Sequence, residues 1–197
     1  MSQQRLRAIL WVLVGLAAIG GILVALQSRS PQSSSADLAS IGGPFTLVGS
    51  DGRPFSSSRL NGKPAAIFFG FTHCPDVCPT TLARLVKLRR QAGKGDEALS
   101  IVFITVDPER DGPAEVGGYA SLFGAPVIGL TGSPADIERV KKQFGVFSQK
   151  VDQPGGGYSV DHSAAVFLMD RNGKFVATLS PEESDNVALA KLQRILG

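Results

Sequence analysis

The chain has 197 residues, of which 43% are hydrophobic and 19% are charged, and its formal net charge at pH 7 is +3. This length suits one globular domain with an appendage, and it is sufficient to bury a sizeable core. The 20 Lys and Arg residues are scattered among 17 Asp and Glu residues, so no basic block indicates a nucleic-acid-binding protein. The chain has two cysteines, which permit one intramolecular disulfide bond at most.

An uncharged apolar run of 19 residues occupies positions 8–26. About 20 such residues span the hydrocarbon core of a bilayer, whereas the apolar part of a cleavable signal peptide has about 7 to 15. The run therefore predicts a retained transmembrane anchor over residues 8–27, with a cleaved signal as the alternative. Arg5 and Arg7 precede the run and a single arginine follows it closely, which predicts that residues 1–7 lie in the cytoplasm or matrix.

Residues 28–40 are rich in Ser, Gln and Ala and show no apolar periodicity, so they predict a flexible linker. Residues 41–197 then form the folded domain. The anchor orientation places this domain in the periplasm, at the inner membrane of a bacterium, or in the intermembrane space of a mitochondrion. Both compartments permit a disulfide bond between the two cysteines.

The first half of the folded domain predicts a hairpin, two buried strands and a helix. Short apolar segments on either side of a Gly-Ser-Asp-Gly turn predict an N-terminal β-hairpin over residues 44–56. The apolar run 65–71 predicts a buried strand, and an amphipathic pattern that starts near Pro79 predicts a helix that ends at Gly93. A second buried strand is predicted over 101–106.

The second half begins with a charged loop over 107–113. The elements expected after it are a short helix, a strand at 127–130, a helix opened by a capping-box pattern at 133–136, a strand at 147–151, a glycine-rich loop at 152–163, strands at 164–169 and 174–179 joined by an Asn-Gly turn, and a C-terminal helix. This order predicts an α/β fold in which helices pack on a mixed central sheet with an antiparallel pair at its end.

Both cysteines lie between the predicted strand 65–71 and the helix that follows it, in the segment His73-Cys74-Pro75-Asp76-Val77-Cys78-Pro79. Pro79 suits the first helical position, so Cys78 is expected at or near the helix N-terminus. Unpaired backbone N–H groups at that end favour a thiolate, which predicts that Cys78, and also Cys74, is readily deprotonated. A thiolate is both a nucleophile and a soft metal ligand.

His162 precedes the predicted strand 164–169, and the carboxyl ends of parallel strands are where sites form in such sheets. If that strand is antiparallel to the cysteine strand, His162 lies at the same sheet edge as Cys74 and Cys78. Two thiolates and one imidazole suit Cu(I), and Asp161, a water or a backbone group could supply a fourth donor for Cu(II).

Structural zinc is the alternative metal, but it usually has four protein ligands. Four Cys and His ligands could be reached here only with His73, whose backbone adjoins that of Cys74, so copper is favoured over zinc. His73 is expected to be a polar surface residue, and Asp76 a solvated turn residue. The charged residues of the loop 107–113 are expected to hold their own loop, with partner recognition as the alternative.

Four segments together resemble the Sco/SenC family over about residues 43–196. They are Gly70-Phe71-Thr72-His73-Cys74-Pro75-Asp76-Val77-Cys78-Pro79-Thr80-Thr81-Leu82, Val106-Asp107-Pro108-Glu109-Arg110-Asp111, Gly129-Leu130-Thr131-Gly132 and Val160-Asp161-His162-Ser163. The resemblance implies a thioredoxin-like fold on a single membrane anchor. It also implies that Cys74, Cys78 and His162 bind copper, and that the protein helps metallate the binuclear copper site of cytochrome c oxidase subunit II.

Three functions remain open from the sequence. In the first, a metallochaperone holds copper through Cys74, Cys78 and His162 and passes it to an acceptor, with a thiol reductant keeping the cysteines reduced. In the second, Cys74 and Cys78 are the redox-active pair of a thiol-disulfide oxidoreductase, which does not need His162. Their three-residue gap departs from the two-residue gap of thioredoxin-type enzymes, so poor general activity is expected. The third is a copper or redox sensor.

Overall fold

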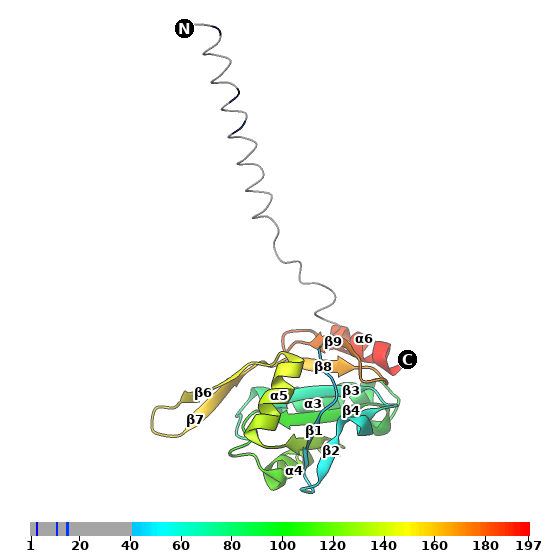
Figure 1. Cartoon of the computed structure of the whole chain (residues 1–197). Helices are drawn as coiled ribbons and strands as arrows, with labels where there is room; N and C mark the ends of the chain where they lie inside the picture. Colours follow the sequence, from blue (N-terminus) through cyan, green and yellow to red (C-terminus); the bar gives the residue numbers. More distant parts are fainter. Residues whose placement is uncertain (1–2, 4–10, 12–14, 16–40) are drawn as a thin grey trace. The chain divides into compact units, whose positions relative to one another are not determined.

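The computed structural model of the chain describes residues 41–197 together with Gln3, Trp11 and Gly15 (Figure 1). Of the predicted anchor at 8–27, only Trp11 and Gly15 are among the described residues. The predicted linker at 28–40 lies wholly outside them. Within the part of the chain that is described, no helix has the length and apolar character needed to cross a membrane. The continuous described part of the chain starts at Ile41.

A seven-stranded mixed sheet forms the centre of the domain. In chain order its strands are β1 (Thr46–Gly49), β2 (Pro54–Ser56), β3 (Ala65–Gly70), β4 (Ser100–Thr105), β5 (Ile128–Thr131), β8 (Val166–Met169) and β9 (Phe175–Leu179). In space their order is β2-β1-β5-β4-β3-β8-β9. β1 and β2 pair as the predicted N-terminal hairpin, and β8 and β9 form the predicted antiparallel pair at the other edge.

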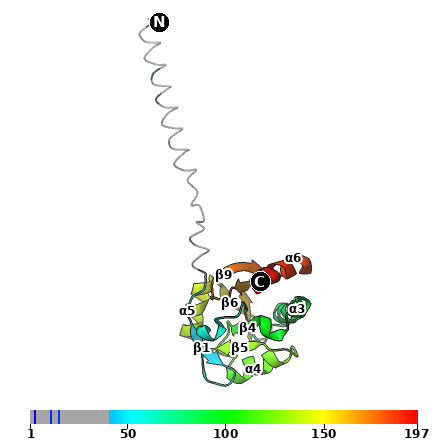
Figure 2. The ribbon, with the colours of Figure 1, turned by 90° about the vertical axis from the view of Figure 1, so that its right-hand side faces the viewer.

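Four α-helices within residues 41–197 cover this sheet. They are α3 (Val77–Gln91), α4 (Pro113–Ser121), α5 (Pro134–Phe144) and α6 (Asp185–Leu196), and single 3-10 turns occur at Ser57–Leu60 and Asp96–Ala98. Figure 2 shows α3 and α6 on one side of the sheet and α5 on the other. The capping pattern predicted for α5 is confirmed, because the Ser133 hydroxyl accepts the Asp136 N–H at 3.1 Å and Gly145 ends the helix at φ +66°. The mixed central sheet and the helices on both of its faces confirm the predicted thioredoxin-like α/β fold.

The strand directions bring the carboxyl ends of β3 and β4 and the beginning of β8 together at the same end of the central strands. β3 and β4 are parallel, so the residues after Gly70 and after Thr105 emerge side by side. β8 is antiparallel to β3, with Phe68 opposite Val166, so β8 begins beside the carboxyl end of β3. This is the arrangement that the sequence required for His162 to approach the cysteines.

The prediction of a loop over residues 152–163 is wrong for most of these residues. β6 (Ser148–Asp152) and β7 (Tyr158–His162) pair as a two-stranded antiparallel sheet that is separate from the central one. Gly155, Gly156 and Gly157 all have positive φ and confine the irregular backbone to the hairpin turn. The polar, half-exposed strands on either side carry little apolar alternation, which is why the pattern indicated a loop.

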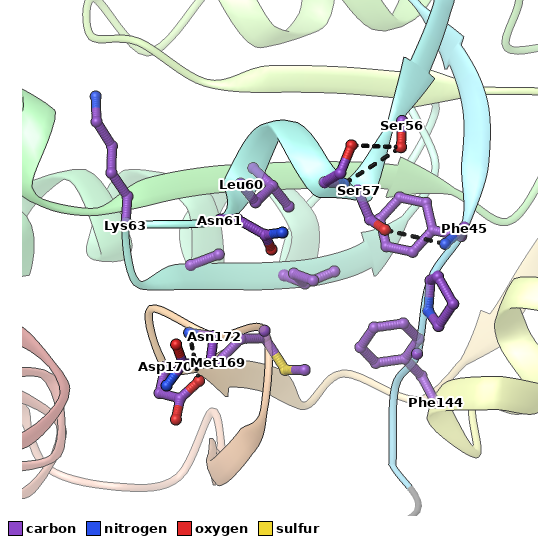
Figure 3. Close-up of a pocket in the computed structure, with 16 residues that line it drawn as sticks. Phe45, Ser56, Ser57, Leu60, Asn61, Lys63, Phe144, Met169, Asp170 and Asn172 are labelled. Carbon is purple, nitrogen blue, oxygen red and sulfur yellow. Dashed lines mark hydrogen bonds between the residues drawn. The ribbon is translucent and has the colours of Figure 1, made fainter.

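A cavity of about 290 Å³ lies between the 3-10 turn Ser57–Leu60, the beginning of β3 and the end of α5 (Figure 3). Apolar side chains, including Phe45 and Phe144, form part of its wall, and Asn61 and Asp170 add polar groups. Neither cysteine and neither histidine lines it. Its lining includes the first residue of β3, whereas the cysteines follow the last, so the cavity is separate from the site described next.

Candidate metal centre

The cysteine segment leaves β3 in a tight turn and enters α3. The Cys74 N–H donates to the Phe71 carbonyl at 3.2 Å, and the Cys78 N–H donates to Cys74 Sγ at 3.4 Å. α3 begins at Val77 with Asp76 at the N-cap, two residues earlier than predicted. Proline is tolerated in the first helical turn because its missing N–H would have no intrahelical partner. Cys78 therefore lies inside that turn, with its backbone N–H directed to the other sulfur.

Gly70 makes room for the Cys78 sulfur. A Cβ atom at position 70 would lie 2.8 Å from Cys78 Sγ and 3.0 Å from the Phe103 ring, both closer than ordinary van der Waals contact. The last residue of β3 must therefore lack a side chain for the thiol to occupy this buried position. Cys78 is fully buried in the core, whereas Cys74 is only partly buried at its edge.

Asp111 ties the cysteine turn to the neighbouring strands. Its carboxylate is fully buried and accepts the Thr72 N–H at 2.9 Å, the Thr72 hydroxyl at 2.6 Å and the Thr105 hydroxyl at 2.6 Å. Its backbone carbonyl accepts the Thr131 hydroxyl at 2.6 Å. Charge-assisted hydrogen bonds of this kind are about twice as strong as neutral ones. One side chain thus joins the last residue of β4 to Thr72, which lies two residues after the end of β3 and two residues before Cys74.

His162, the last residue of β7, directs one ring nitrogen at Cys78. Its Nδ1 lies 2.9 Å from the Ser163 carbonyl oxygen, which can only accept, so Nδ1 carries the proton. Nε2 then has a free lone pair and lies 3.4 Å from Cys78 Sγ. The rings of Phe68 and Phe71 contact the imidazole edge to face, at centroid distances of 6.1 and 5.8 Å. The histidine is therefore held in the tautomer and orientation of a metal ligand.

The structure brings Cys74, Cys78 and His162 together. One ligand atom from each residue lies within 4.8 Å of the others, although His162 is 84 residues from Cys78 in the chain. Cys78 is buried, and the other two residues are partly exposed. The arrangement offers two soft sulfur donors and one imidazole nitrogen, and solvent or a partner can approach it from the Cys74 and His162 side.

The expectation that Cys78 is readily deprotonated is wrong for the metal-free protein. Burial raises the pKa of the Cys78 thiol far above its ordinary value of 9.0, and the neighbouring Cys74 raises it further, while a backbone hydrogen bond at Phe71 acts against them. Desolvation by burial is the largest of these effects on the pKa of Cys78. Burial also lowers the pKa of His162 below its ordinary 6.5, against the opposing effects of the Ser163 carbonyl and Asp161, so the imidazole is neutral at neutral pH.

The remaining residues considered from the sequence lie outside this cluster. His73 is mostly exposed, and its Nδ1 lies 3.1 Å from the Thr72 hydroxyl. Asp76 is exposed at the N-cap position of α3 without a side-chain capping hydrogen bond, and Asp161 is exposed on β7. Within residues 41–197, the group around the two sulfurs contains three ligand residues, and no fourth side chain of a type that binds zinc joins them. The donor set is thus incomplete for structural zinc and fits copper.

Sequence reasoning missed the residues that support the site. Gly70 carries no signal beyond a glycine at a strand end, and its role depends on a sulfur eight residues away. Asp111 was expected to hold its own loop, but its carboxylate bonds Thr72, in the turn after β3, and Thr105, the last residue of β4. Its position after a buried strand was a signal that it could reach the neighbouring strand end.

Comparisons with known proteins agree with this site. The SCO1/SenC family description matches residues 33–197. An SCO2-like protein of Rickettsia conorii is 36% identical over 183 residues, which cover 88% of this chain and 89% of that protein. The structure of Bradyrhizobium japonicum ScoI with copper bound is 43% identical with a TM-score of 0.71, and covers 79% of this chain and 99% of that one.

A third relative is BsSco, described as a member of the Sco family of cytochrome c oxidase assembly proteins in a structure that identified a disulfide switch. It is 26% identical with a TM-score of 0.61, and the match covers 79% of this chain and 94% of that one. The family match covers most of the chain, and the Rickettsia relative matches along nearly its whole length. This chain therefore belongs to the SCO1/SenC family.

Proposed function

We propose that this protein is a copper metallochaperone that binds one copper ion through Cys74, Cys78 and His162. The observation that carries the proposal is the convergence of three ligand atoms within 4.8 Å at a partly exposed edge of the domain. Copper bound to the Bradyrhizobium relative supports the choice of metal. The ion is the cargo of the protein, and the function is to hold it and release it to an acceptor.

The donor set suits copper in both oxidation states to different degrees. Cu(I) prefers thiolates and accepts low coordination numbers, so Cys74 and Cys78 provide most of its binding. Cu(II) needs the imidazole nitrogen of His162 and a further donor, such as Asp161, water or a backbone group. His162 is therefore the ligand whose loss discriminates between the two states.

Burial predicts the order in which the ligands exchange. Cys74 and His162 are partly exposed, so an acceptor's ligand can reach the metal from their side. Cys78 is fully buried beneath Gly70 and is the last ligand to leave. Because its thiol is protonated in the metal-free protein, release of copper is completed when Cys78 regains its proton.

The acceptor we propose is the binuclear copper site of cytochrome c oxidase subunit II. The description of BsSco as a member of a family of oxidase assembly proteins supports this assignment. A thiol reductant is also required, because a disulfide bond between Cys74 and Cys78 would remove both sulfur ligands. The apolar run at 8–26 supports a single-pass anchor that keeps the domain in the periplasm or intermembrane space.

Thiol-disulfide exchange is the second candidate function. In that reaction the Cys74 thiolate attacks one sulfur of a target disulfide, forms a mixed disulfide with it and releases the other sulfur as a thiolate. The Cys78 thiolate then attacks the Cys74 sulfur, which releases the second target thiolate and forms the Cys74–Cys78 disulfide. The partial exposure of Cys74 suits the attacking role. The raised pKa of Cys78 makes it a slow resolving thiol, so copper binding is the better supported function.

Anaerobic titration of the purified chain with Cu(I), in competition with a chelator of known affinity, tests the proposal. We expect one equivalent to bind, with loss of tight binding in Cys74→Ser and Cys78→Ser. His162→Ala should bind Cu(II) at least about 10- to 100-fold more weakly, because the loss of a ligand should cost no less than the loss of a residue that orients one. Full affinity in all three variants would overturn the proposal. A His162→Ala variant that supports normal oxidase assembly in cells would favour thiol-disulfide exchange.

A further inference from the structure

The hairpin that carries His162 has no backbone pairing with the central sheet. β7 pairs with β6 in a sheet of two strands, and Figure 1 shows this hairpin extending away from the rest of the domain. At its base, the Ser163 N–H donates to the Phe147 carbonyl at 3.0 Å, and in the middle of β7 Val160 packs into the core. Residues 163–165 join His162 to β8, and beyond this short link the position of β7 depends on side chains that join the hairpin to the domain.

Arg110, in the loop after β4, provides such a connection at the first residue of β7. Its guanidinium carbon lies 3.8 Å from the centroid of the Tyr158 ring, and Nη1 donates to the Tyr158 carbonyl at 2.9 Å. Its Nε donates to Asp107, whose other carboxylate oxygen accepts the Tyr158 hydroxyl at 2.9 Å. Arg110, Asp107 and Tyr158 thus form a closed ring of contacts, which we call the Arg110 latch.

The environment of the latch makes these contacts stronger than those of a surface ion pair. The Asp107 side chain is fully buried and that of Arg110 is 26% exposed. Partial burial reduces screening by solvent, and hydrogen bonds between charged groups are about twice as strong as neutral ones. Arg110 also lies 5.9 Å from the centroid of the Phe71 ring, which itself packs against the His162 imidazole. The guanidinium therefore connects the strand that carries His162 with the turn that carries the cysteines.

We propose that Arg110 is a positioning residue for the third copper ligand, and that the Arg110 latch sets how firmly His162 is held against the two sulfurs. This inference rests on the proposed function of the cluster. Cu(I) can be retained by two thiolates alone, whereas Cu(II) requires the imidazole. The latch therefore controls the Cu(II) state selectively, and opening it leaves copper on the two cysteines.

Arg110→Met tests this inference, since it retains an unbranched side chain and removes every donor. We expect Cu(II) affinity to fall about tenfold or more, as for other residues that orient a ligand. The visible charge-transfer spectrum and the electron paramagnetic resonance spectrum should move toward those of His162→Ala, while Cu(I) stoichiometry stays at one. Arg110→Lys retains the charge but lacks the planar fork, so it should lie between wild type and Arg110→Met.

Arg59→Met is the matched control, because Arg59 stacks on Phe55 at 4.8 Å in a different part of the domain. It should leave the copper spectra unchanged. The metal-free protein gives a second readout: amide hydrogen exchange over residues 158–162 should accelerate in Arg110→Met, while exchange in β3 should not change. Tyr158→Phe, which removes only the hydroxyl contact to Asp107, should accelerate it to a smaller extent.

The outcomes separate the latch from the copper proposal. A wild-type chain that binds no copper would overturn the proposed function, and amide exchange would still test the latch. Wild-type spectra and exchange in Arg110→Met would overturn the latch while leaving copper binding intact. If Arg110→Met fails to fold, Arg110→Lys and Tyr158→Phe decide by the same two readouts. Equal changes in Arg59→Met would show a general effect of lost arginine and would also overturn the latch.

Discussion

Cys78 Sγ lies 3.4 Å from His162 Nε2, and the two residues are 84 positions apart in the chain. Nδ1 of the same ring donates its proton in a hydrogen bond to the Ser163 carbonyl. Nε2 therefore accepts a hydrogen bond from the Cys78 thiol in the metal-free protein. The two groups are thus held in contact before copper binds. When the metal replaces this proton, little movement of either side chain is needed, and less ordering entropy is lost on binding.

The two cysteines should differ strongly in reactivity in the reduced, metal-free protein. Cys78 is fully buried and its pKa is raised, whereas Cys74 is partly exposed. Each unit by which a pKa exceeds the pH lowers the thiolate fraction about tenfold. We therefore expect iodoacetamide at pH 7.5 to alkylate Cys74 about tenfold faster than Cys78 or more. Mass spectrometry of the peptides at successive times measures both rates, and equal rates would contradict the burial of Cys78.

Replacing Gly70 with alanine should disturb the site from beneath. The added Cβ would lie 2.8 Å from Cys78 Sγ and 3.0 Å from the Phe103 ring. Overpacking of this kind typically costs about 1–3 kcal/mol of stability. We expect Gly70→Ala to lower the urea midpoint accordingly and to weaken Cu(I) binding by displacing one sulfur.

Gly118→Ala is the control for that change. Gly118 lies in α4 with open space around the position of its missing Cβ. Alanine in a helix interior is about 0.5–1 kcal/mol more favourable than glycine, so this variant should be as stable as wild type or more so. A Gly70→Ala variant that behaves like Gly118→Ala would show that the sulfur does not occupy the place described.

The central part of the fold was predictable because its signals are local. The run at 65–71 is apolar at nearly every position, as a strand buried on both faces requires, and β3 is buried throughout. Ser133 and Gly145 mark the ends of α5 by chemistry that acts within a few residues. The approach of His162 to Cys78 also followed from the sequence, since it needed only the antiparallel direction of β8, together with the resemblance.

The contacts that support the site could not be predicted in the same way. The carboxylate of Asp111 bonds Thr72 across 39 positions of the chain, and the ring of Tyr158 meets Arg110 across 48. Such pairs depend on exact strand register, which hydrophobic patterning does not specify. The raised pKa of Cys78 was missed for a related reason: the helix N-terminus is visible in the sequence, whereas the depth of burial is not.

Asp111→Asn should loosen the cysteine turn. An asparagine side chain has one acceptor oxygen in place of two, and its amide would face hydrogen-bond donors of Thr72 or Thr105. Losing hydrogen bonds to a buried charged group typically costs about 1.5–3 kcal/mol each. We expect a loss of unfolding free energy in that range in urea denaturation. Asp152→Asn, at an exposed position of β6, is the control and should be unchanged.

Asp185 predicts a measurable pH dependence of stability. Its carboxylate accepts hydrogen bonds from Lys87 at 2.9 Å and from Arg84 at 2.8 Å, and these partners hold its pKa below the ordinary value of 3.8. Because the folded-state pKa is the lower one, the stabilisation is fully present well above pH 3.8 and is lost as the pH falls through the folded-state pKa. The Asp185 carboxylate joins the beginning of α6 to α3, so protonation of this group should loosen the contact between the two helices.

Urea unfolding of the wild type and Asp185→Asn between pH 7 and pH 2.5 tests this dependence. Wild type should be the more stable chain at pH 7, and the difference should shrink toward zero at the acid end, where the carboxyl group is protonated and resembles the amide. Asp51→Asn is the comparison, since Asp51 is an exposed turn residue that bonds only a nearby backbone N–H. A difference between wild type and Asp185→Asn that is constant across the whole pH range would mean that the ion pairs with Lys87 and Arg84 do not stabilise the fold.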